Sequence, residues 1–106
     1  MAVSDKPWGQ FSDADYPDAD AYCRASLIDL NPAGQPKTKD ACKLRVREPG
    51  GDLNRNGVHA AAAVLAGARG GVDAPAAAKR AAARKLVGLY GQLNETPPDS
   101  VRRLAS

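Results

Sequence analysis

The second half of the chain places its apolar residues at helical spacing. A first run recurs every three or four positions and predicts a helix capped by Asp52 or Asn54. A second run follows Pro75, and proline favours the first position of a helix because its missing N–H is not needed there. Gly70 and Gly71 separate the runs, so we expect an alanine-rich helical hairpin. Its apolar stripes are Val58, Ala61, Ala62, Leu65, Ala78, Ala82, Leu86, Leu89, Tyr90 and Leu93.

Two short segments ahead of these helices have the pattern of β-strands. Residues 26–30 are largely apolar and end at an Asn-Pro turn. Residues 43–47 alternate, with Leu44 and Val46 on one face and Lys43, Arg45 and Arg47 on the other. Two strands alone are not stable in water, so we expect an antiparallel pair packed on the helices. The predicted fold class is therefore α+β.

Residues 1–11 are expected to form an extended N-terminal arm on a single small domain of residues 12–106. Alanine supplies much of the apolar content of the 106 residues, so the core is thin. Two interpretations of Trp8 stay open: it folds back onto the helices, or it anchors in a neighbouring subunit. Gly57 lies inside a predicted helix, where it costs about 1 kcal/mol relative to alanine, so a close neighbour is expected there.

The segment after the arm is rich in aspartate. We expect one helical turn capped by Ser12 or Asp13 and a short helix over residues 19–24 that begins at Asp18 or Asp20. The aspartates at 13, 15, 18 and 20 also suggest a calcium loop. A proline interrupts the run, however, and the glycine and closing glutamate of such a loop do not follow, so caps and solvated acids are expected.

Charge is distributed unevenly along the chain. Residues 1–36 hold six aspartates against two basic residues, whereas residues 37–106 hold thirteen basic residues against six acids. This polarity suits head-to-tail self-association, or an acidic arm lying across the basic helices of its own chain. Four basic residues on the last long helix, which we expect to be solvated, are the candidates for binding nucleic acid or another anion: Lys79, Arg80, Arg84 and Lys85.

Reactive side chains are few. Cys23 and Cys42 are expected to be reduced thiols, with a disulfide as the next interpretation and a redox pair as the least favoured. Together with His59 they are too few for a four-ligand zinc site. His59 has no carboxylate or nucleophile near it in the sequence, so it is expected on a helix surface. The glycines around residues 67–71 lack the phosphate-loop pattern and are explained as a helix end. We expect no catalytic residue, metal or cofactor.

The N-terminus lacks the apolar run of a signal peptide, and no segment has the roughly 20 apolar residues of a membrane span. We therefore expect a chain that is not secreted by a signal peptide and does not enter a membrane.

Several segments resemble a small module of actinobacterial tailed phages and prophages that occurs near, or fused to, head-morphogenesis proteins. The resemblance covers about residues 8–104 and rests on residues 8–16, 23–29, 39–44, 53–61, 67–71 and 86–90. It implies a non-enzymatic accessory or decoration protein of the phage head, whose partner is the major capsid protein or another virion protein. It places the chain in the virion or the host cytoplasm. The interface candidates are Trp8, Phe11, Tyr16, Arg45 and Arg47.

Overall fold

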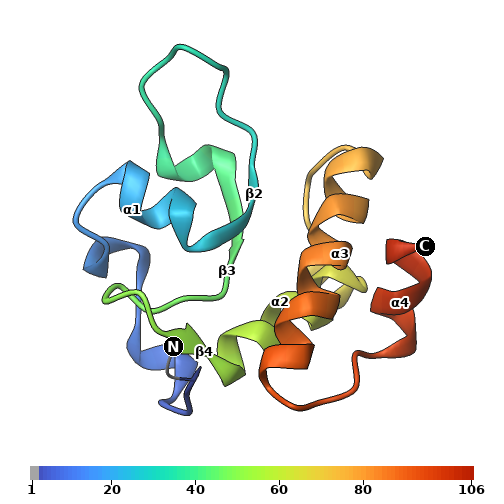
Figure 1. Ribbon diagram of the computed structural model, residues 1–106. Coiled ribbons are helices and arrows are strands. Elements are labelled where there is room, and N and C mark those ends of the chain that lie inside the picture. The colour runs from blue at the N-terminus through green and yellow to red at the C-terminus, as the bar shows by residue number, and fades with distance from the viewer. Residues whose placement is uncertain (1–2) are drawn as a thin grey trace.

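The computed structural model describes residues 3–106, so the first two residues of the predicted arm lie outside the described part. The fold is α+β, as predicted. A short helix and a two-stranded sheet lie on one side of a long helix, α3, and the last helix lies along its other side (Figure 1). The elements are β1 (Val3–Ser4), α1 (Ala19–Arg24), β2 (Ser26–Asp29), β3 (Cys42–Arg45), β4 (Leu53–Asn54), α2 (Arg55–Leu65), α3 (Ala76–Gln92) and α4 (Asp99–Ala105).

The predicted antiparallel pair is confirmed as β2 and β3. Ser26 lies opposite Arg45 and Asp29 lies opposite Cys42. Leu44 departs from the expected pattern, because its φ of +63° is a left-handed conformation that a regular strand does not have. Its side chain packs against the core that holds the buried Val46 but is itself only half-buried.

A second strand pair was not predicted. β1, in the arm, pairs in parallel with β4, and Val3 lies opposite Leu53. Each strand has two residues, too few for any periodicity to appear in the sequence. The pair fastens the arm immediately before α2 begins.

Local capping signals are confirmed at three helical elements. The Asn54 side chain accepts the Gly57 N–H at 2.7 Å and begins α2, and Asp18 accepts the Ala21 N–H at 2.8 Å and begins α1. Ser12 and Asp15 form a capping box on a short 3-10 turn. Gly67, with φ of +115°, follows the end of α2 in the left-handed conformation that favours glycine. The described residues contain no helix long and apolar enough to cross a membrane.

The apolar stripes predicted for the helices are buried in the larger core of the described residues, except for Ala78, which is half-buried against it. This core holds Val58 and Leu65 of α2, Leu86 of α3 and Val101 of α4, together with Val46 beside the sheet. A smaller core lies between α1 and β3, and consists of Tyr16, Tyr22, Cys23, Ala25 and Cys42. Burial of the Tyr22 hydroxyl raises its pKa to about 12.

The expectation of two reduced thiols is wrong, because Cys23 and Cys42 form a disulfide with a Cα–Cα distance of 5.4 Å. The antiparallel pairing explains why they meet. β2 follows α1 directly, and its pairing with β3 returns Cys42 to the last turn of α1. The sequence names the two cysteines but does not specify that approach.

The loop after β2 is fastened by Asp29, which forms an ion pair with Lys37 and accepts the Asn31 N–H at 2.9 Å. These contacts hold the pKa of Asp29 at about 2, below its ordinary value of 3.8. A lowered folded-state pKa stabilises the fold above the ordinary value and loses that contribution as the pH falls. We expect Asp29→Asn to remove part of the loss of stability between about pH 4 and pH 2, measured by urea unfolding across this range. An Asp40→Asn control should keep the wild-type profile, and the same profile in Asp29→Asn would contradict the assignment.

Candidate protein-interaction site

Arg45 brings the predicted interface residues together. Its Nη2 donates to the Phe11 carbonyl oxygen at 2.9 Å, and its guanidinium lies 4.5 Å from the ring centre of Trp8 and 5.7 Å from that of Tyr16. The Tyr16 hydroxyl donates to the Arg47 carbonyl oxygen. The five residues come from the arm, the following turn, the end of β3 and the segment just after it, so the sheet and the arm share one contact network.

The arginine is well provided with partners. Its Nε lies 3.4 Å from an Asp13 carboxylate oxygen, and its side chain is 18% exposed. A guanidinium stacked on an aromatic ring and hydrogen-bonded in plane is held in one orientation, because both contacts depend on the direction of its flat face. Arg45 therefore holds Trp8 through its ring and Phe11 through its backbone carbonyl oxygen, and the rings of these two residues lie 5.8 Å apart.

Trp8 folds back onto its own domain. A Cβ built on Gly57 would lie 3.0 Å from three carbons of the indole ring, which is closer than a comfortable contact. This is the close neighbour expected from a glycine inside α2. The interpretation of Trp8 as a side chain packed on its own helices is confirmed, and the ring stays half-exposed.

Hydrogen bonds from the start of α2 fasten the arm beside Trp8. The fully buried Asn54 donates to the Lys6 carbonyl oxygen at 3.1 Å and to the Glu48 carboxylate at 2.9 Å. Arg55 pairs with Asp5 at 2.6 Å. Asp5, the one acidic residue of the arm, thus meets a basic residue of its own chain. Sequence reasoning found Asn54 only as a helix cap, because nothing local indicates that its amide reaches the arm.

A groove of about 520 Å³ opens between the arm, β3 and α2. The half-exposed side chains of Trp8, Phe11, Leu44 and Val64 line it, with Arg45 beside them. The sequence did not indicate Leu44 and Val64 as site residues. Val64 lies off the buried stripe of α2, so an apolar residue at that helical position was the available signal.

The four basic candidates on α3 differ in their contacts and in their exposure to solvent. Arg84 Nε donates to the Ala105 carbonyl oxygen of α4 at 3.0 Å, whereas Lys85 Nζ donates to the Leu27 carbonyl oxygen of β2 at 3.2 Å. Lys79 is half-buried and Arg80 is exposed. Two of the four charges therefore bind backbone on separate neighbours of α3.

His59 has a carboxylate partner that the sequence did not indicate. Its Nε2 lies 2.7 Å from Oε1 of Glu95, and its ring stacks on Tyr90 at 5.9 Å. Hydrogen bonds from His59 and Arg55 lower the pKa of Glu95. The expectation of a histidine without a nearby carboxylate is wrong, because the loop before α4 returns Glu95 to α2. With 43% of its side chain exposed, His59 does lie on the helix surface, and the pair connects the loop to Arg55 and the arm.

Three of the four aspartates considered for calcium have other contacts. Asp15 and Asp18 cap helical turns, and Asp13 pairs with Arg45.

The comparisons with known proteins add no family: no family model, curated protein or solved structure matches the chain.

The contact between Gly57 and Trp8 predicts opposite effects of one substitution in two backgrounds. In a Trp8→Ala chain, Gly57→Ala should stabilise the fold by up to about 1 kcal/mol, because alanine favours the helix. With Trp8 present, the new methyl group displaces the indole, and the gain should be lost or reversed. Urea unfolding of the four chains measures this coupling, and tryptophan fluorescence should shift in Gly57→Ala alone. Equal effects in both backgrounds would contradict the packing of Trp8 on α2.

Proposed function

We propose that the protein is a non-enzymatic interaction module whose groove between the arm, β3 and α2 receives an apolar segment of a partner protein. The observation that carries this proposal is the groove lined by Trp8, Phe11, Leu44 and Val64. Arg45 also lines the groove, and its contacts hold it in one orientation. Tryptophan, tyrosine and arginine are the residues that most often dominate binding energy at protein interfaces. Half-exposed apolar side chains around one hollow are a typical feature of such surfaces.

We further propose a protein of the phage head as the partner, so that the chain is a capsid decoration or accessory head protein. The resemblance of its sequence segments to the phage module supports this assignment. The disulfide supports a place on the outside of a released particle, because disulfides persist in oxidising surroundings such as virion surfaces and are rare in cytosol. The first step, groove binding, does not depend on this second step.

The groove and the particle are tested together by a matched pair of substitutions. Val64→Glu places a charge in the groove, whereas Val87→Glu places the same charge on exposed α3, outside the groove. Particles of a phage that encodes the chain are purified, and the bound chain is quantified by mass spectrometry. We expect the wild type and Val87→Glu to remain attached and Val64→Glu to fall at least about tenfold, the effect of losing about 1.4 kcal/mol of binding energy. Circular dichroism should show both variants folded.

Two results would count against the proposal. Absence of the chain from particles would contradict the proposed phage-head partner, and equal attachment of both variants would contradict the proposed binding through the groove.

Nucleic-acid binding through Lys79, Arg80, Arg84 and Lys85 is the alternative function. It is measured with duplex DNA at rising salt, since phosphate contacts weaken steeply as salt increases. Because Arg84 and Lys85 bind backbone of their own chain, we expect only weak binding that disappears by physiological salt.

A further inference from the structure

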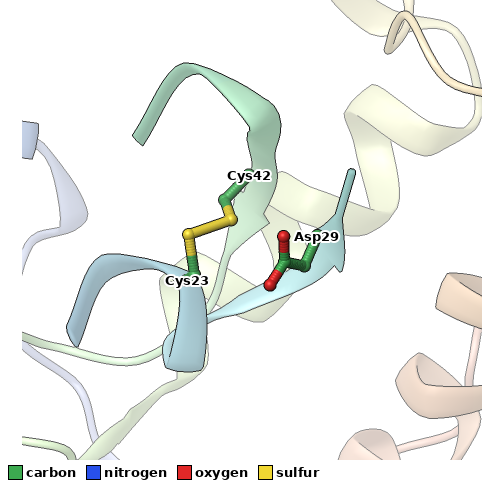
Figure 2. A group of neighbouring side chains, drawn as sticks. All are labelled: Cys23, Asp29 and Cys42. Atoms are coloured by element: carbon green, nitrogen blue, oxygen red, sulfur yellow. A yellow bond between two sulfur atoms is a disulfide. The ribbon is translucent and has the colours of Figure 1, made fainter. Parts of the chain in front are cut away.

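Three potential metal ligands meet beside the sheet. Cys23 lies in the last turn of α1, Cys42 begins β3, and Asp29 ends β2, with its carboxylate facing the two sulfurs (Figure 2). One ligand atom from each residue lies within 4.8 Å of the other two. Tetrahedral zinc sites place ligand atoms about 3.5 Å apart, so separation of the sulfurs and a small shift of the carboxylate would complete this arrangement.

The side-chain amide of Asn31 contacts all three potential ligands and orients them. Its Nδ2 lies 3.6 Å from the Cys23 sulfur and 3.4 Å from the Cys42 sulfur, and it donates to Asp29 at 2.8 Å. The orientation of the amide is defined by the Thr38 N–H, which donates to Asn31 Oδ1 at 2.9 Å. N–H groups directed at sulfur stabilise the negative charge of a thiolate, and such outer contacts orient metal-bound ligands.

The site is accessible from solvent on one side. A cavity of about 230 Å³ lies against it and is lined by Asp20, Cys23, Arg24, Asp29 and Lys37. A cation bound by the two sulfurs and Asp29 would replace the Lys37 ammonium group at the carboxylate, and the cavity has room for a water molecule as its fourth ligand. Three protein ligands and one water complete a tetrahedral zinc site.

We propose that, once the disulfide is reduced, Cys23, Cys42 and Asp29 bind one thiophilic divalent cation of the zinc class. A dithiol reductant transfers two electrons and two protons to the disulfide, becomes a disulfide itself, and leaves two thiols on the protein. The cation then displaces one proton from each thiol and forms two metal–sulfur bonds. In the sequence alone, only the two cysteines and the histidine were considered as zinc ligands, and they are too few. Asp29 joins the cysteines only through the pairing of β2 with β3.

This site would cross-link the smaller core under both redox conditions. In oxidising surroundings the disulfide joins α1 to β3, and in reducing surroundings the cation joins the same two elements and also β2. Metal binding of this kind adds to folding stability, because the unfolded chain does not hold the ligands together. The proposal is independent of the function proposed for the groove.

The test uses the full chain reduced with a phosphine and titrated with Co²⁺ under anaerobic conditions. We expect thiolate-to-cobalt absorption that saturates at one ion per chain, release of two protons, displacement by Zn²⁺ and a rise in melting temperature. Asp29→Asn should weaken binding at least about tenfold, the lower limit even for lost outer-shell contacts. Asp40→Asn, the loss of an exposed carboxylate two residues before Cys42, should bind as the wild type does. The Cys23→Ser/Cys42→Ser chain should show no charge-transfer band.

Three outcomes would overturn the proposal: no saturable band in the reduced wild type, equal affinity in Asp29→Asn and the wild type, or equal binding by the oxidised protein. Circular dichroism is recorded in the same titrations. If the reduced chain is unfolded before metal is added, recovery of helical signal with Co²⁺ in the wild type and Asp40→Asn supports the site. Failure of that recovery counts against it.

Discussion

Replacing Leu86 by alanine is expected to lower the free energy of unfolding by about 2–5 kcal/mol, which is a large part of the stability of a small domain. Leu86 lies on α3 in the larger core and is fully buried. Because many of the surrounding core residues are alanines, which have short side chains, the neighbours have little capacity to fill the resulting cavity. Urea unfolding followed by circular dichroism measures the change.

The neighbouring Val87 is the matched control, since it lies on the same helix but is 38% exposed. Val87→Ala should change the stability by no more than about 0.5 kcal/mol. If the two substitutions have the same effect, the buried face of α3 has been assigned incorrectly.

Loss of the disulfide is the second large effect. The Cys23→Ala/Cys42→Ala chain should unfold about 2–5 kcal/mol more easily, because the bond closes a loop over 19 positions and restricts the unfolded chain. The measurement is urea unfolding in metal-free buffer with and without reductant. Reductant should destabilise the wild type by a similar amount and leave the double variant unchanged. A wild type insensitive to full reduction would contradict this stabilising role.

The disulfide also matters for the groove, because the groove spans both cores. Tyr22 of the smaller core and Ala61 of the larger core both line it. Any loosening of α1 and β3 would therefore alter the spacing of Leu44 and Arg45 relative to α2. Reduction of the disulfide is consequently expected to change binding through the groove, and binding should be measured under both oxidising and reducing conditions.

Most of the helical architecture could be predicted from the sequence. The stripes of α2 and α3, the caps at Ser12, Asp18 and Asn54, and the close neighbour of Gly57 all follow from local rules. Apolar spacing, a side-chain oxygen before a helix and a glycine inside one describe residues that are near each other in the chain. The identity of that neighbour, Trp8, was not available from such rules.

The site depended on tertiary structure. Arg45 was predicted to contribute to an interface, but its stacking on Trp8 and its bond to Phe11 join residues more than 30 positions apart. The same holds for His59 with Glu95 and for β1 with β4, and Asp29 meets the disulfide only because β2 pairs with β3. Local periodicity and capping were enough to predict the helices, the pairing of β2 with β3 and the fold class. Which distant side chains meet depends instead on how packing closes the long loops between them, and no local pattern in the sequence contains that information.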